Sequence, residues 1–168
     1  MGTITTGLCN SFKHELLKGL HDFDSDTFKI ALIKASPTDS YSAATSNYSV
    51  GNYDNDGGTS YSVNTTLTGN NNDEHANGNG YTTGGATLGS VTVTLTSTTA
   101  HIDFADPAWT SATLDAEGCL IYNSSSKGSV AGRAVCVISF GSTQSADNGT
   151  FTITMPSDGA STSIIRVA

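Results

Sequence analysis

The alternation of apolar and polar side chains after residue 90 restricts the possible folds more than any other feature of this chain. In VTVTL (91–95) the two valines and the leucine fall on one face of an extended strand, and the threonines fall on the other. Turn-forming residues, with no helical pattern, separate the runs of this kind. They predict an antiparallel β-sandwich, or a flattened barrel, whose main core lies in residues 90–168. The predicted strands are 91–95, 100–104, 119–123, 133–140, 150–155 and 163–167.

Two further elements precede this region. Four large apolar residues recur at spacings of three and four, which predicts one amphipathic helix over residues 10–23, after an N-terminal arm of residues 1–9. The segment 27–34 (TFKIALIK) is apolar on both faces, which predicts a covered strand with the helix lying across it. We therefore expect a single domain over residues 1–168. The apolar residues of the predicted helix are Phe12, Leu16, Leu20 and Phe23.

Residues 36–85 differ from the rest of the chain. They are rich in Ser, Asn, Gly and Asp and contain few aliphatic side chains. We predict a long polar loop excursion, which either forms short edge strands or becomes ordered against a partner. Tyrosine supplies a large, stiff contact area at low entropic cost, so the tyrosines here are candidate partner contacts. These candidates are Tyr41, Tyr48, Tyr53 and Tyr61.

The charge balance excludes several classes of partner. Seven basic and fifteen acidic residues give a formal net charge of −8. Binding to nucleic acid requires clustered Lys and Arg, and so does docking on an anionic membrane. We therefore expect neither a nucleic-acid partner nor a membrane partner. The N-terminus lacks the pattern of a signal peptide, and no run is long enough to span a membrane.

The three cysteines do not resemble a disulfide framework or a redox motif. Their number is odd and no CxxC occurs. Cys119 and Cys136 each lie in an apolar run, which predicts that they are small buried hydrophobic residues. A disulfide between the two is the alternative.

The stretch DFADPAWTSATL (103–114) places two carboxylates, Asp103 and Asp106, beside the only tryptophan. Such a group could form the floor of a sugar-cleaving site, but a glycosidase needs two carboxylates on opposite sides of a cleft. A spacing of three around a turn does not supply them. Asp106 and Pro107 have the pattern of a tight turn. We therefore predict that they are structural, with Trp109 as a packing anchor over the sandwich edge or the helix.

Two other acidic groups are candidate metal sites. Asp22, Asp24 and Asp26 match the first half of a calcium loop, but Thr27 replaces the required glycine and Ile33 the required glutamate. A solvated turn is the favoured interpretation.

The second group is Asp73, Glu74 and His75, which are consecutive and have no second His or Cys at zinc spacing. We interpret them as part of a flexible loop. The sequence therefore predicts no metal, no cofactor and no catalytic residue.

Several stretches in the same order along the chain resemble a family of small virion proteins of tailed bacteriophages. The resemblance covers nearly the whole chain, and its sharpest motifs are DFADPAW and LIYN. Glu117 and Cys119 depart from the basic residue and the alanine that are common before LIYN, and the 40–75 loop is longer and richer in Asn. The matching stretches are SFKHELLKG, HDFDSDTFKIAL, EHANGNGYTTGGATL, IDFADPAWTSATLDAEGCLIYN, RAVCVISFG and GTFTITMPSDGASTSIIRVA.

The resemblance implies a structural component of the particle and no enzyme activity. Within the particle, we favour a capsid decoration or cement protein on the capsid exterior, assembled in the cytoplasm of the bacterial host. Its partners would be the major capsid protein and neighbouring copies of itself, in many copies per particle. The alternative is a tail, baseplate or fibre-associated protein that contacts the host surface. A glycan-processing enzyme would require Asp103 or Asp106 to line a cleft with another carboxylate.

Overall fold

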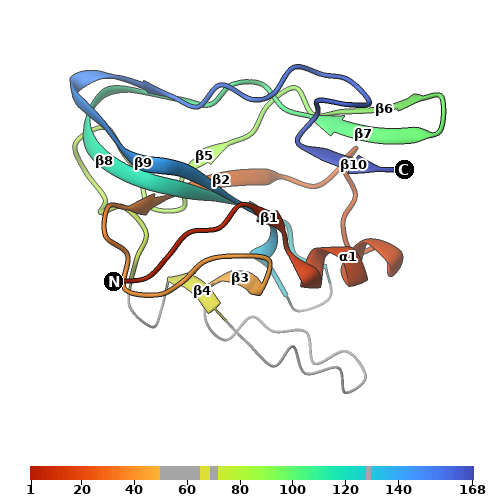
Figure 1. Ribbon diagram of the computed structural model, residues 1–168, viewed down its shortest axis with the longest axis horizontal. Helices are drawn as coiled ribbons and strands as arrows, with labels where there is room; N and C mark the ends of the chain where they lie inside the picture. Colours follow the sequence, from red (N-terminus) through yellow and green to blue (C-terminus); the bar gives the residue numbers. More distant parts are fainter. Residues whose placement is uncertain (50–64, 69–71, 128–129) are drawn as a thin grey trace.

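The protein is mainly β, with one short helix near the N-terminus (Figure 1). The computed structural model describes residues 1–49, 65–68, 72–127 and 130–168. The helix is α1 (Asn10–Leu17). The strands in these residues are β1 (Gly7–Leu8), β2 (Phe28–Lys34), β3 (Thr45–Ser49), β4 (Thr65–Thr68), β5 (Ala86–Thr87), β6 (Thr92–Thr96), β7 (Thr99–Asp103), β8 (Ala108–Asn123), β9 (Arg133–Thr152) and β10 (Ile165–Val167).

The strands form two sheets. The larger has the order β4-β3-β9-β8-β2-β5, with β1 also paired to β9, and the smaller has the order β10-β7-β6. The pairings between these strands are antiparallel except for the one between β3 and β4. The predicted fold class, a mainly antiparallel, sandwich-like β fold with one N-terminal helix, is confirmed.

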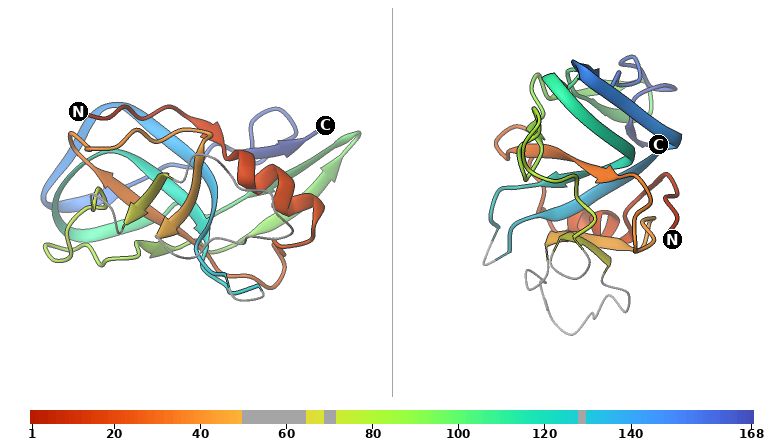
Figure 2. Two further views of the ribbon diagram at one scale, coloured as in Figure 1. Left: turned by 90° about the horizontal axis from the view of Figure 1, so that it is seen from below. Right: turned by 90° about the vertical axis from the view of Figure 1, so that its left-hand side faces the viewer.

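β8 and β9 shape the molecule because they form one long antiparallel ribbon. β8 has 16 residues and β9 has 20, and their pairing shifts register at four places. Such irregularities bend a β-ribbon, and this one arches over β2 (Figures 1 and 2). The prediction of separate strands at 133–140 and 150–155 is therefore wrong. The Gly- and Ser-rich segment between them does not form a turn between strands but continues β9.

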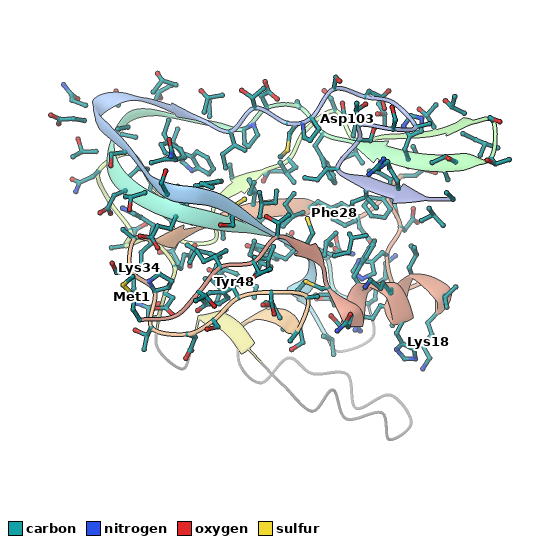
Figure 3. All side chains as sticks on the ribbon, viewed as in Figure 1. Met1, Lys18, Phe28, Lys34, Tyr48 and Asp103 are labelled. Carbon is teal, nitrogen blue, oxygen red and sulfur yellow. The ribbon has the colours of Figure 1, made fainter. Side chains whose placement is uncertain are left out.

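The core is centred on β2, which lies between β8 and β5. Phe28 and each residue from Ile30 to Ile33 are fully buried, as expected for a strand covered on both faces. Phe28 lies in the interior close to the helix side of the molecule (Figure 3). Cys119 and Cys136 are buried free thiols, as predicted. Burial raises the pKa of Cys136 to about 12, so this thiol is unreactive at neutral pH.

The helix is shorter than predicted, because it ends at Leu17 and not at residue 23. Gly19 has a φ of +68°. Its N–H donates to the Leu16 carbonyl (3.1 Å), and the Leu20 N–H donates to the Glu15 carbonyl (3.0 Å). This pair of bonds is a Schellman motif, which stops a helix where glycine adopts a left-handed conformation. Consequently Phe23 lies in the following turn, and its ring stacks on the ring of Phe28 in β2 at a centroid distance of 4.4 Å.

The sheet β10-β7-β6 reaches beyond the core. Ile102 and Ile165, in β7 and β10, are buried, but Val93 is 54% exposed and Leu95 is 71% exposed. The expectation that the alternating residues 91–95 face the main core is therefore wrong for the centre and end of this strand. The β6–β7 hairpin projects from one end of the molecule (Figure 1). Its apolar face is covered at Ile102 in β7 but is open to solvent along β6.

Candidate interaction surfaces

Asp106 and Pro107 hold the start of β8 against the segment that follows β9. The Asp106 carboxylate accepts a hydrogen bond from the Met155 N–H (2.7 Å). The Pro107 carbonyl accepts one from the Ile153 N–H (3.0 Å). These bonds satisfy backbone groups at the point where the ribbon ends, which is a structural role. The prediction of a tight turn at Asp106 and Pro107 is wrong, because residues 104–107 form an irregular link between β7 and β8 that contains no turn, and the Asp106 carboxylate accepts from a backbone N–H 49 residues away.

Trp109 is 6% exposed, which gives the indole the place of a packing anchor. Its ring lies 6.0 Å from the ring of Tyr81 and 6.0 Å from the ring of Phe151. The indole therefore joins the 72–85 loop to the distal half of the ribbon. Its neighbours are these two rings and not the helix, which was one of the two predicted packing sites.

Asp103 lies on the outer layer (Figure 3), on the same face of β7 as His101. One carboxylate oxygen of Asp103 is buried without a hydrogen-bond partner in the described chain. His101 contacts a different carboxylate, with 2.9 Å between its Nδ1 and the Asp158 Oδ1. Asp103 and Asp106 thus belong to two separate hydrogen-bonding environments, and the structure does not pair them across a cleft.

Thr96, His101 and Asp158 form a hydroxyl–imidazole–carboxylate row. The Thr96 Oγ1 lies 3.1 Å from the His101 Nε2. Ser163 closes the network, because its Oγ lies 3.3 Å from the His101 Nδ1 and donates to Asp158 (3.1 Å). Only Ser163 of these four residues lines the groove described below. We interpret the network as the tie that holds the 156–164 segment on β7, since His101 is buried and both of its ring nitrogens have partners in the chain.

The tyrosines predicted to contact a partner are not available as a group. Tyr41 is 1% exposed and its hydroxyl donates to Asp73 (2.9 Å), so its assignment as an exposed contact residue is wrong. Tyr48 is half-buried, stacks on Tyr122 at 4.4 Å, and donates to Glu74. Figure 3 places its side chain within the molecule. Tyr53 and Tyr61 lie outside the described residues.

Asp73 is a structural centre that the sequence did not reveal. It is fully buried and accepts hydrogen bonds from the Thr38 N–H (2.9 Å) and the Asp39 N–H (2.8 Å). The Lys34 ammonium lies 2.9 Å from its Oδ1. Burial by itself would raise the pKa of this carboxyl, but these donors, together with the Tyr41 hydroxyl, outweigh burial and lower the pKa below its ordinary value.

Glu74 is a second buried carboxylate that accepts several hydrogen bonds, here from the segment that follows it and from Tyr48. It is 4% exposed and accepts from the hydroxyls of Tyr48 (2.5 Å) and Tyr81 (2.7 Å) and from the Gly84 N–H (2.7 Å). The interpretation of residues 73–75 as part of a flexible loop is therefore wrong. The two carboxylates hold segments of the polar excursion against β2. In the described chain, no group of three candidate ligands could hold a metal ion.

An open groove with a volume of about 700 Å³ runs beside β9. Its lining contains no charged side chain, in a protein of net charge −8. Seven of its 15 lining residues are apolar, and the other eight are Ser, Thr or Gln. The apolar residues are Ile138, Phe140, Phe151, Ile153, Met155, Pro156 and Ile164.

A second uncharged surface is the exposed strand β6. No Asp, Glu, Lys or Arg occurs between residues 76 and 100, which include β5 and β6. Val93 and Leu95 lie on one face of the strand, and the threonines lie on the other. Sequence patterning identified this alternation but assigned its apolar face to the core, and it assigned the groove residues to core strands as well. An apolar residue on a strand gives no signal of whether a second layer covers it.

Comparison with protein-family models, with curated proteins and with solved structures finds no match to this chain. Within the described residues, no helix has the length and apolar character needed to cross a bilayer.

Proposed function

We propose that this chain is a non-enzymatic structural protein of a tailed-phage particle, and specifically a decoration or cement protein of the capsid exterior. It binds the shell formed by the major capsid protein and contacts neighbouring copies of itself. The resemblance of its DFADPAW and LIYN motifs to small virion proteins supports the phage assignment. The observation that carries the adhesive role is the uncharged groove beside β9, together with the exposed apolar face of β6.

The distribution of charge supports adhesion to protein. Most acidic side chains of the described residues lie away from the groove and from β6, so these two surfaces can be buried without stranding an ionised group. Charged residues are depleted at the centre of protein interfaces for the same reason. A shell presents many equivalent sites, so a contact that is weak in one copy becomes stable through repetition.

The carboxylates argue for the non-enzymatic part of the proposal. Asp73, Glu74 and Asp106 each accept hydrogen bonds from the backbone or from side chains that they hold in place. None of the three lines the groove. The groove therefore offers shape and apolar contact area but no ionisable group for acid–base chemistry.

The decisive experiment is to add the purified protein to shells of the major capsid protein that lack it, and to image the product. We expect density for this domain at repeated positions on the outer surface, with hundreds of copies per particle by the logic of a repeated shell site. A few dozen copies or fewer, confined to the tail, would instead support the tail, baseplate or fibre alternative. Absence of the domain from shell and tail would contradict the proposal.

A further inference from the structure

β6 is an edge strand without the features that normally protect an edge. Its five residues, Thr92 to Thr96, are all exposed and include no charged residue and no proline. It pairs with β7 in continuous register, without a bulge. Natural edge strands usually carry a charge, a proline or a bulge that prevents a second chain from adding to them. In the described chain, the outer backbone edge of β6 is therefore unpaired and its apolar face is exposed to solvent.

β9 has a second open edge, and the groove lies along it. On the side away from β8, β9 pairs with β3 at Arg133 and with β1 at Cys136 and Val137. Past these positions the Ser139 N–H donates to the Thr6 hydroxyl (2.9 Å), and no strand of the described chain pairs with this side of β9. A strand added there would continue an edge that β1 has already begun to cover.

The two surfaces match in chemistry. Val93 and Leu95 point to the same side of β6 and are about 7 Å apart along the strand. These two exposed apolar side chains can pack against the half-buried Phe140 and Ile153, which line the groove. Neither surface has a charge, so a contact between them avoids the repulsion that two acidic copies would otherwise experience.

β6 cannot fill the groove of its own chain. Thr162 to Ile164, which precede β10, line the groove, and β7 lies between β10 and β6 in the small sheet. The hairpin also projects away from the body of the molecule (Figure 1). A β6 strand that fills this groove must therefore belong to another molecule.

We propose that the occupant is β6 of a second copy, which docks in the groove and adds to the open edge of β9. This inference rests on the adhesive role proposed above and names the partner of the groove. The contact is heterologous, since each copy offers one strand and one groove, so it links copies head to tail. A five-residue strand buries far less than the ~1,600 Å² of a standard interface, so we expect weak association that becomes effective when copies are held side by side on a shell.

The first test is sedimentation velocity of the purified protein from about 10 µM to about 1 mM. We expect the average mass of the wild-type protein to rise with concentration. Leu95→Asp places a charge on the apolar face that would be buried in the groove, and it should weaken association at least about tenfold. Thr94→Asp adds the same charge to the same strand but on the opposite face, and should weaken association much less.

The second test mixes two blocked variants. Leu95→Asp keeps an intact groove, and Thr152→Asp, an exposed groove position on β9, keeps an intact strand. Each variant alone should remain monomeric, and an equimolar mixture should form a dimer that grows no further. Melting curves that match the wild type verify that both variants are folded.

Three results would overturn this inference. They are a wild-type protein that stays monomeric up to about 1 mM, a Thr94→Asp effect as large as that of Leu95→Asp, and a mixture that remains monomeric. The failures of the two proposals differ. If the protein stays monomeric but still decorates shells, only the strand-in-groove contact is contradicted. If it self-associates but binds neither shell nor tail, only the proposed function is contradicted.

Discussion

β2 and β6 are both strands with aliphatic side chains, but β2 is apolar on both faces and buried, whereas β6 is apolar on one face and exposed. FKIALIK and TVTLT both contain β-branched and aliphatic residues at strand spacing. β2 lies between two neighbouring strands and its apolar residues are fully buried, whereas every residue of β6 is exposed. The same side-chain types therefore contribute to stability in β2 and are left for contact in β6. What separates them is whether a second layer covers the strand, and the following predictions test this difference.

The largest effect on stability is expected for Trp109→Ala in the distal half of the ribbon. Loss of an indole packed between Tyr81 and Phe151 should lower the free energy of unfolding by about 3 to 5 kcal/mol. Urea denaturation followed by circular dichroism measures it. An unchanged midpoint would mean that this half of the ribbon is packed no better than β6.

Leu32→Ala tests β2 directly. The side chain is fully buried in β2, so truncation leaves a cavity and should cost about 2 to 5 kcal/mol. The denaturant dependence of the unfolding free energy should stay constant if the folded and unfolded states keep their compactness. If Leu32→Ala lowers the free energy of unfolding no more than a substitution of an exposed residue does, the contrast drawn between a buried β2 and an exposed β6 is contradicted.

Asp73→Asn tests the anchor that holds the polar excursion beside β2. The amide keeps the shape but loses the charge facing the Lys34 ammonium and turns a donor toward backbone N–H groups, so we expect a loss of about 1 to 3 kcal/mol at pH 7. Chemical denaturation measures it, and Asp147→Asn, an exposed carboxylate, is the matched control.

The same pair of variants predicts a pH dependence. Because the pKa of Asp73 is lowered in the folded protein, its contribution is complete above the unfolded-state value of about 3.9 and disappears as the pH falls through the folded-state pKa. The wild-type protein and Asp147→Asn should therefore lose more stability than Asp73→Asn between pH 5 and acid pH. Parallel curves for all three proteins would contradict this account of Asp73.

Leu95→Ala should have the smallest effect on stability. The side chain is 71% exposed, so we expect a change within about 0.5 kcal/mol in the isolated chain. Thermal unfolding at low protein concentration measures it without a contribution from self-association. A loss comparable to that of Leu32→Ala would show that β6 belongs to the core after all.

Local chemistry made part of the fold predictable. Turn-forming residues around a period-two pattern predicted β strands, and the strand 27–34 was confirmed almost to its ends. The buried thiols follow from the preference of cysteine for apolar surroundings. The helix end was missed because Leu20 and Phe23 continue the apolar spacing past Gly19, and they pack as a turn and not as a helix face.

The polar excursion shows where such reasoning stops. Asp73 and Glu74 are buried because donors more than 20 positions away converge on them: the Asp39 N–H and the Tyr41 hydroxyl on Asp73, and the Tyr48 hydroxyl on Glu74. Nothing within a few residues of 73 or 74 specifies those donors. The same holds for Tyr41, whose contact with Asp73 joins residues 32 positions apart.

The sequence by itself determined that the chain is an acidic, mainly β protein with one N-terminal helix, since periodicity, turn residues and charge are local properties. The tertiary structure alone decided which apolar faces are covered. It placed β2 inside, left β6 outside, and opened an uncharged groove along β9. The physical reason is that burial depends on which strands become neighbours, and that choice is made by contacts between residues far apart in the chain.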